Sequence, residues 1–218
     1  MPCECGYQFV PGIDDELHAK FHAAYLYGPS LSVLDELTST ATIFGNSLFV
    51  IDAQIPEAQR KLFVAVADVA QATMTGYSYG YYGTVDEREQ TMFVLASDGH
   101  AIGMAIVGLD GPCWKLSWAP GYSLQLMEKV ASPGPHRIVA RVWIAAAYHR
   151  RGFASQMLHA VARHYSIDCK DLGWELPLTP AGAQLLRSLL PGTWLGRADP
   201  ITLRETLSDS VRDLQHRT

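Results

Sequence analysis

The chain has 218 residues, of which 48% are hydrophobic, and a formal net charge of −5 at pH 7. This length suits one well-packed core with a small additional unit. The acidic balance argues against a general nucleic-acid binder, whose surface would be basic, and no apolar run reaches the roughly 18 residues of a membrane span. Two of the four cysteines lie close together near histidines and two are isolated, which indicates an intracellular protein with a metal site and not a disulfide framework.

Residues 1–28 contain metal-ligand side chains at close spacing. Cys3 and Cys5 are separated by one residue, and His18 and His22 follow after a further twelve residues, one helical turn apart. Two thiolates and two imidazoles suit tetrahedral Zn²⁺, and a unit this short needs the metal in order to fold. The spacing therefore predicts a zinc finger with these four ligands, although two residues usually separate the cysteines. The alternative is an unligated tail with coincidental histidines.

The helix that carries the two histidines has local signals of its own. Asp14 or Asp15 is placed to cap its start. Its one basic residue is Lys20, a composition that suits packing better than contact with DNA bases. We expect a minimal core for this unit from Tyr7, Phe9, Leu17 and Phe21.

The next segment predicts a linker followed by a strand, a helix and a loop. Residues 29–47 are rich in Ser and Thr and predict the linker, and residues 47–52 predict the strand. Pro56 opens a helix that runs to about residue 73. Residues 75–84 contain three Gly and four Tyr and predict an aromatic loop, which either gates a substrate site or packs on the domain.

An Asp-Gly pair, Asp98 and Gly99, lies between two apolar runs and predicts a tight β-hairpin. We expect a third strand at residues 113–118 and a helical turn at residues 124–130. Towards the C-terminus the sequence predicts a strand, a helix with a Thr cap and Pro at its first position, and an amphipathic helix. Their ranges are residues 172–178, 179–190 and 202–214.

The centre of the chain predicts a strand, a tight turn and a helix. Arg141–Ala145 holds the β-branched and aromatic residues typical of a buried strand, and apolar residues recur at helical spacing from Ala154 to Tyr165. The turn between them contains Arg150, Arg151 and Gly152. Free N–H groups at a helix start, a glycine that allows close approach and two cations suit a pyrophosphate. The alternative is a basic surface turn that caps the helix.

The order Arg-Arg-x-Gly-x-Ala differs from the glycine spacing of dinucleotide and Walker loops. It resembles the acetyl-CoA loop of the GNAT acetyltransferases, Gln/Arg-x-x-Gly-x-Gly/Ala, with His149 as a departure in the first position. The predicted element order is also that of the GNAT fold. The resemblance implies an α/β fold with a mixed central sheet and flanking helices, preceded by the small zinc-finger unit. It also implies an acetyl-CoA site formed by Val142, Trp143, Ile144, His149, Arg150, Arg151, Gly152, Phe153, Ala154 and Ser155.

A more specific resemblance is to the cohesin acetyltransferases, in which a zinc finger directly precedes a GNAT domain. Their Arg-Ile-Trp-Val strand is similar to Arg141–Ile144, and their Pro-Thr-x-x-Gly segment is similar to Pro177, Thr179 and Gly182. Their finger is similar to Cys5, Gly6, Phe9, Pro11, Gly12, Asp15, Glu16, His18, Phe21 and His22. We therefore expect a zinc finger at 1–28, a linker at 29–47, a GNAT domain at 48–198 and a C-terminal amphipathic helix at 199–218.

The likeness stops at the acid–base residues. Ala140 stands where the family has a serine, and His159 where it has a catalytic glutamate. Leu176 and Pro177 lie near the position of its aspartate, with Glu175 beside them. The resemblance thus implies the architecture and the cofactor, and not the cohesin substrate.

The expected activity is acetyl-CoA-dependent N-acetylation of a primary amine, with a protein lysine as the acceptor. An acidic chain also suits a small cationic acceptor, either aminoglycoside-like or polyamine-like. A CoA-binding module without catalysis, whose zinc finger holds a partner, is a further alternative. We expect no membrane association and no direct nucleic-acid contact, and the oligomeric state stays open. The expected location is intracellular, cytoplasmic in a bacterium and nuclear in a true relative of the cohesin acetyltransferases.

The acceptor ammonium has a reference pKa near ~10.4 and must lose a proton before it attacks. Glu175 is the first candidate base, because a carboxylate half-buried beside the apolar Trp174 and Leu176 would be more basic than an exposed one. His159 is the second candidate, because an imidazole titrates near neutral pH. The alternatives are an outward-facing strand residue for Glu175 and an exposed helix residue for His159. A backbone N–H near Ile144 is expected to polarise the thioester carbonyl.

Overall fold

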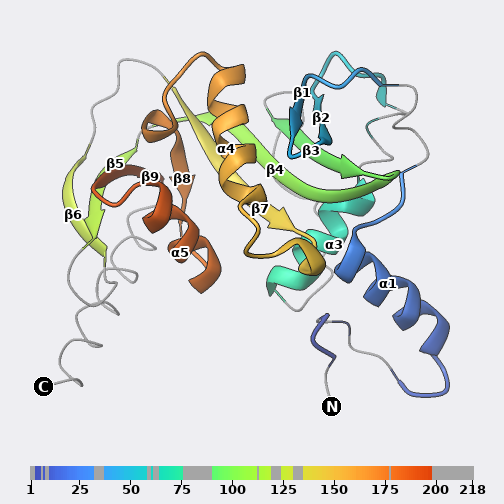
Figure 1. The fold of residues 1–218 in the computed structure, drawn as a ribbon. Coiled ribbons are helices and arrows are strands. Elements are labelled where there is room, and N and C mark those ends of the chain that lie inside the picture. Colours follow the sequence, from blue (N-terminus) through green and yellow to red (C-terminus); the bar gives the residue numbers. More distant parts are fainter. Residues whose placement is uncertain are drawn as a thin grey trace, which may run out of the picture. The chain divides into compact units, whose positions relative to one another are not determined.

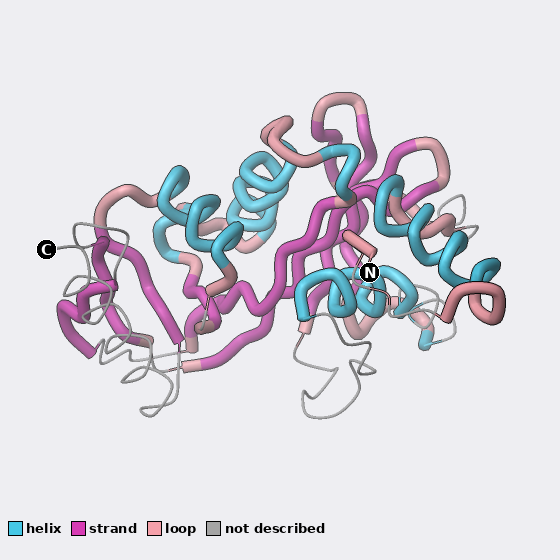
Figure 2. Tube along the Cα trace, turned by 90° about the horizontal axis from the view of Figure 1, so that it is seen from below, coloured by secondary structure: helices cyan, strands magenta, loops and turns pink. Residues whose placement is uncertain are grey.

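The structure of the protein is a computed structural model, which describes residues 3–5, 7, 10–31, 37–57, 60, 64–75, 90–111, 113–118, 124–129, 135–176 and 178–197. Within these ranges nine strands form a mixed sheet with helices beside it, in the order β1-β2-β3-β4-β7-β8-β9-β5-β6 (Figure 1). The strands are β1 (Ala41–Ile43), β2 (Asn46–Ile51), β3 (Thr91–Ser97), β4 (His100–Asp110), β5 (Trp114–Trp118), β6 (Leu124–Lys129), β7 (His136–Ile144), β8 (Gly173–Glu175) and β9 (Thr193–Arg197). The helices are α1 (Asp15–Tyr27), α3 (Val64–Thr75), α4 (Phe153–His164) and α5 (Pro180–Leu189), with short 3₁₀ turns η3 (Ala146–Tyr148) and η4 (Cys169–Asp171). Figure 2 distinguishes the helices from the strands by colour.

The chain divides into two compact units. The first comprises residues 1–106 and 142–157, and the second comprises residues 107–141 and 158–218. The strands β4 and β7 and the helix α4 each have residues in both units. The strand order and the helices beside the sheet confirm the expected mixed sheet with flanking helices.

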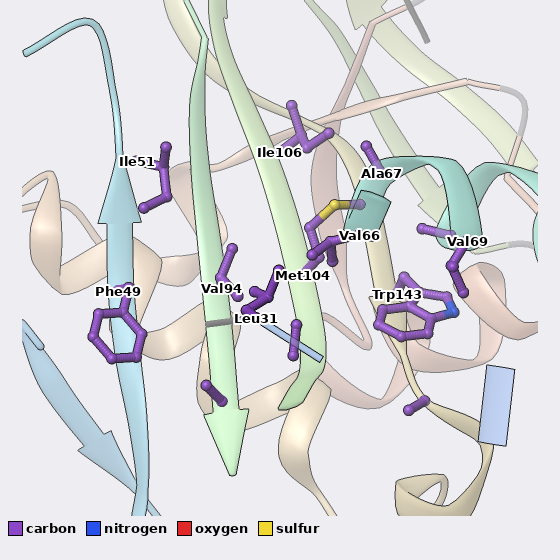
Figure 3. Close-up of a cluster of buried hydrophobic side chains, with 14 residues drawn as sticks. Leu31, Phe49, Ile51, Val66, Ala67, Val69, Val94, Met104, Ile106 and Trp143 are labelled. Carbon is purple, nitrogen blue, oxygen red and sulfur yellow. The ribbon is translucent and has the colours of Figure 1, made fainter. Parts of the chain in front are cut away.

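In the first unit, β1, β2 and β3 pair antiparallel in succession, and α3 covers a core formed with β4 and the end of β7. Figure 3 shows Val66 and Val69 of α3 facing the same cluster as Met104, Ile106 and Trp143. Fully burying one such side chain stabilises a fold by about 1.5–3 kcal/mol. The face of α3 that carries Val66, Val69 and Ala70 is thus buried in this core.

The predicted hairpin joins β3 to β4. Asp98 and Gly99 have φ values of 48° and 75°, and positive φ at both central positions is what a type I′ turn requires. The residues predicted as a linker join this structure, because the Leu31 N–H donates to the Gly99 carbonyl at 2.8 Å and the Ala101 N–H donates to the Pro29 carbonyl at 2.9 Å. The linker range also contains the strand β1.

In the second unit, β8 pairs parallel with β7 and with β9, and β5 pairs antiparallel with β9 and β6. The helical turn predicted at residues 124–130 is wrong, because Leu124–Lys129 forms the strand β6. Pairing with β5 decides this, with Trp118 opposite Leu124. The predicted cap of α5 is confirmed: the Gly182 N–H donates to the Thr179 hydroxyl at 3.1 Å.

Some predicted features lie outside the residues that the structure describes. They are the aromatic loop at 75–84, apart from Thr75 at the end of α3, and the amphipathic helix at 199–218. Phe9, expected in the core of the N-terminal unit, is also outside them. None of the helices that the structure describes is long and apolar enough to span a bilayer.

Candidate functional site

The turn between β7 and α4 has the strand, turn and helix predicted for it (Figure 1). The Ala145 N–H donates to the Ile102 carbonyl at 2.9 Å, which ties the end of β7 to β4. Arg150 and Gly152 have φ values of 59° and 82°, and these left-handed residues redirect the chain into the helix. A non-glycine residue in that region is uncommon, which marks Arg150 as a position that its surroundings hold in place.

The start of α4 presents backbone N–H groups to a ligand. The Gln156 N–H donates to the Gly152 carbonyl at 3.1 Å. The N–H groups that precede Gln156 have no acceptor within the helix and lie at the positive end of its dipole. A Cβ atom on Gly152 would meet the ring of Phe44 at 3.8 Å, an ordinary contact. The arrangement can therefore accept an anion, such as a pyrophosphate, against the backbone.

The side chains around this turn are aromatic and cationic. The Arg151 guanidinium carbon lies 5.5 Å from the ring centroid of Tyr148 and 5.6 Å from that of Phe153. Phe153 also packs edge-to-face on Phe44, with ring centroids 5.3 Å apart. The guanidinium is thus held beside the turn by cation–π contacts that leave Arg151 exposed.

The other residues predicted to contact the cofactor lie at the end of β7, in the turn and at the start of α4. His149 Nε2 lies 2.8 Å from the Ile144 carbonyl oxygen, so its imidazole donates back to the end of β7. Trp143 is buried in the core with α3 and therefore offers a ligand only its backbone. Ile144 is also buried, and Val142, Ala154 and Ser155 are half-buried. The N–H that follows Ile144, that of Ala145, is engaged by β4.

The four predicted metal ligands lie together. The ligand atoms of Cys3, Cys5, His18 and His22 are all within 4.8 Å of one another. Cys3 Sγ is 3.2 Å from His22 Nδ1, and Cys5 Sγ is 3.6 Å from His18 Nε2. Metal–ligand bonds of about 2.0–2.3 Å place the ligand atoms of a tetrahedral zinc roughly 3.3–3.8 Å apart. The donor set therefore suits Zn²⁺, and the two Cys–His distances of 3.2 and 3.6 Å are close to those of a tetrahedral site.

Aromatic rings surround this Cys/His cluster. Tyr7 stacks on His18 with ring centroids 5.8 Å apart, and it also contacts Phe21. Burial raises the pKa of the Cys5 thiol, and a bound cation would act in the opposite direction because it stabilises the thiolate. Leu17, expected in this small core, is 59% exposed instead, because it lies on the face of α1 away from the ligands.

The acidic residues at the start of α1 stabilise the loop before it. Asp14 occupies the cap position, but its carboxylate accepts a bond from the Val10 N–H at 3.1 Å and makes no bond to the helix. Asp15 accepts a bond from the Gly12 N–H at 3.1 Å. The predicted side-chain cap is therefore wrong, because both carboxylates bind backbone N–H groups that precede the helix.

The helix with the metal-ligand histidines packs against the rest of the first unit. α1 contacts both α3 and η3, the turn that leads into the Arg-Arg-Gly segment. Phe21 and Ala24 from α1 and Tyr148 from η3 pack against the same hydrophobic cluster. The Cys/His unit is therefore attached beside the turn that precedes α4.

The two predicted base candidates belong to the second unit. Glu175 on β8 is flanked by two arginines: its carboxylate oxygens lie 3.5 Å from Arg141 Nη1 and 3.5 Å from Arg197 Nη1. Trp174 and Leu176 are buried as expected, but the carboxylate has cationic and not purely apolar neighbours. His159 is exposed on α4.

Two further residues were not identified by the sequence analysis. Asp68 lies on α3 between the buried Ala67 and Val69, and burial raises the pKa of its carboxyl group. An acid inside an apolar helical run is the signal that could have indicated it. The other is Phe44, whose proximity to Gly152 depends on a contact between segments far apart in the chain.

Comparison with known proteins places this architecture in a family. The acetyltransferase (GNAT) family model matches residues 57–170, more than half of the chain. The structure of the xEco2 acetyltransferase domain bound to a lysine–CoA conjugate has a TM-score of 0.62 and 13% identity, over 75% of this chain and 98% of that one. A second structure of the xEco2 acetyltransferase domain has a TM-score of 0.59 and 15% identity, over 75% and 96% of the two chains.

A third structure is more distant. The aminoglycoside N-acetyltransferase AAC(6')-Iy in complex with CoA has a TM-score of 0.39 and 18% identity, over 66% of this chain and 90% of that one. No curated protein sequence matches the chain. The family match covers α3, the β3–β4 hairpin, the Arg-Arg-Gly turn and α4. The chain therefore belongs to the acetyltransferase (GNAT) family, whose members transfer an acetyl group from acetyl-CoA.

Proposed function

We propose that this acetyltransferase modifies the side-chain amine of a protein lysine, with acetyl-CoA bound at the start of α4. The observation that carries the cofactor part is the Arg-Arg-Gly turn, in which N–H groups, a glycine and a guanidinium converge. The xEco2 domain, which shares the fold, is bound to a lysine–CoA conjugate, and this supports a lysine acceptor. The Cys/His unit beside the turn supplies additional surface suited to a macromolecular substrate.

In this proposal the pyrophosphate lies against the backbone of residues 150–154, and the pantetheine arm extends along residues 142–144 of β7. The acceptor amine loses a proton to a base and attacks the thioester carbonyl carbon. The C–S bond then breaks, and the CoA thiolate leaves and takes up a proton. A backbone N–H near Ile144, other than that of Ala145, which donates to the Ile102 carbonyl, stabilises the oxyanion formed during the attack.

We also propose that Cys3, Cys5, His18 and His22 hold one Zn²⁺ with a structural role. Four ligands from the protein close a tetrahedral site and leave no position for a substrate. The ion would join the segment before α1 to α1 itself, and through α1 it would support η3. No step of acetyl transfer involves it.

The acceptor is tested by following release of the CoA thiol with three sets of amines: lysine peptides, polyamines and aminoglycosides. Turnover with lysine peptides alone is the expected result. Turnover confined to the small cationic amines would instead identify a small-molecule acetyltransferase, which the net charge of −5 also suits. Binding of acetyl-CoA without release from any set would identify a non-catalytic CoA-binding module.

Arg151→Ala is expected to weaken acetyl-CoA binding by about 1–3 kcal/mol, the range of a charge-assisted bond to phosphate. Calorimetry measures the dissociation constant. Arg163→Ala, which removes an exposed arginine from the last turn of the same helix, is the control and is expected to leave the affinity unchanged. Equal affinity in wild type and Arg151→Ala would remove Arg151 from the site.

Glu175→Gln is expected to lower turnover roughly 100-fold or more and to leave acetyl-CoA affinity intact, if Glu175 is the base. The two ion pairs of Glu175 give it a competing role in holding β7, β8 and β9 together. Arg197→Gln separates the roles, because it breaks one ion pair and keeps the carboxylate. A purely structural Glu175 predicts that both variants lower the melting temperature and retain turnover.

His159→Ala and Asp68→Asn complete the search for the base, each measured from about pH 6 to about pH 9. The variant that removes the base loses the rise of kcat/KM with pH. If Glu175→Gln and His159→Ala both keep wild-type rates over this range, neither residue is the base. Asp68, solvent or the tyrosine loop at residues 77–82 is then left for that role.

A further inference from the structure

The turn between β1 and β2 contains Phe44, a residue type that does not suit the backbone conformation of its position. Phe44 and Gly45 have φ values of 50° and 81°, nearly the same pair as Asp98 and Gly99 at 48° and 75°. Asn, Asp and Gly are the residues that suit the first of these positions. A phenylalanine there has an unfavourable backbone conformation, and its side chain is 62% exposed.

The turn holds Phe44 in place over the start of α4. The Asn46 side-chain amide donates to the carbonyls of Ile43 and Phe44, at 3.2 and 3.0 Å, and so fixes the turn. The ring of Phe44 packs edge-to-face on Phe153 at an interplanar angle of 85°. Two of its ring carbons lie 3.8 Å from the point that a Cβ on Gly152 would occupy. An exposed aromatic ring therefore borders the glycine against which a pyrophosphate would lie.

We propose that Phe44 is a cofactor-positioning residue whose ring stacks on the adenine base of acetyl-CoA. The inference rests on the proposed placement of the pyrophosphate at Gly152. Adenine is the one aromatic group of acetyl-CoA, and a single ribose separates it from the pyrophosphate, whereas the pantetheine arm has no ring to stack. Stacking of a base on an aromatic side chain contributes about 1–3 kcal/mol by alanine substitution.

Phe44→Asn is the variant that tests the proposal, because asparagine suits the turn and is expected to leave the melting temperature unchanged or raise it. Three probes are titrated by calorimetry: acetyl-CoA, adenosine 3′,5′-bisphosphate, and S-acetyl-4′-phosphopantetheine, which has the thioester and no adenosine. Phe44→Asn is expected to weaken the first two by roughly 5-fold to 150-fold, the equivalent of the stacking contribution, and to leave the third unchanged. Phe44→Tyr, which keeps an aromatic ring, is expected to bind all three like wild type.

Other results would overturn the proposal. Equal weakening of all three probes would show that Phe44 acts on the shape of the turn and not on adenine, and unchanged binding of acetyl-CoA would remove Phe44 from the site. If Phe44→Asn instead converts a dimer to a monomer in sedimentation and keeps the affinity, the ring packs on a second copy of the chain. Gly152→Leu distinguishes a wrong role for Phe44 from a wrong cofactor site. If only the role of Phe44 is wrong, Gly152→Leu still abolishes acetyl-CoA binding. If the pyrophosphate does not lie at Gly152, Gly152→Leu also leaves acetyl-CoA binding intact.

Discussion

Replacing Gly152 with leucine is expected to abolish acetyl-CoA binding without unfolding the protein. Gly152 has a φ of 82°, and a residue with a Cβ in the left-handed region costs roughly 1–2 kcal/mol. Among the residues that the structure describes, a Cβ atom at this position would come within 4 Å of the Phe44 ring alone, at 3.8 Å, so the fold has room for the first atom of the new side chain. The larger effect falls on the ligand, because the leucine side chain occupies the place proposed for the pyrophosphate.

Gly99→Leu is the matched control for this experiment. Gly99 has a φ of 75°, and apart from its two neighbours no atom of the described residues lies within 4 Å of the Cβ position. Leucine there therefore produces similar backbone strain away from the proposed cofactor site. Both variants are expected to lower the melting temperature by a similar amount, and only Gly152→Leu loses binding in calorimetry. Wild-type affinity in Gly152→Leu would contradict the proposed cofactor site.

Removal of zinc is expected to have the largest effect on the N-terminal segment. No residue of α1 is fully buried, and Phe21 and Ala24 pack on the core while only partly buried, so packing alone holds the helix weakly. Zinc-finger peptides, in contrast, bind the ion with an apparent free energy of about 10–16 kcal/mol. Elemental analysis of the purified protein should give about one zinc per chain. Chelation should abolish the protection of α1 in hydrogen exchange, and, because α1 packs against η3, it should also weaken acetyl-CoA binding.

Cys5→Ser is expected to reproduce the chelated state, and Cys169→Ser, which alters a partly exposed thiol outside the cluster, should retain the zinc. Cys3→Ser tests the shortened Cys-x-Cys spacing. If Cys3 is a ligand, its loss lowers the zinc content. If water or another side chain takes the fourth position, zinc binding is weak in the wild type and unchanged in Cys3→Ser. Protein that contains no zinc and melts at the same temperature with and without chelator would contradict the site.

Several features were predictable from the sequence because they depend on residues close together in the chain. The Asp98–Gly99 turn is specified by two residues that tolerate positive φ, and the start of α5 by Thr179 and Pro180. The Arg-Arg-Gly turn and α4 follow from a glycine beside a periodic apolar stripe. The four proposed metal ligands lie together because one helical turn aligns the histidines and the chain before α1 brings the cysteines to them.

The tertiary structure decided which segments become strands where the strand depends on a partner far away in the chain. Residues 124–129 have no local signal that excludes a helix, and they form β6 because β5 supplies backbone partners. The short strand β9 is likewise specified by pairing with β5 and β8.

The neighbours of a side chain were predictable where they are adjacent in sequence and not predictable where they come from distant strands. The apolar neighbours of Glu175 are adjacent in sequence and were predictable, but the two arginines that pair with it come from β7 and β9. Phe44 reaches Gly152 only through the packing of the β1–β2 turn on α4. Local turn chemistry and periodicity act within a few residues, whereas strand pairing and ion pairs depend on which distant segments the folded core brings into contact.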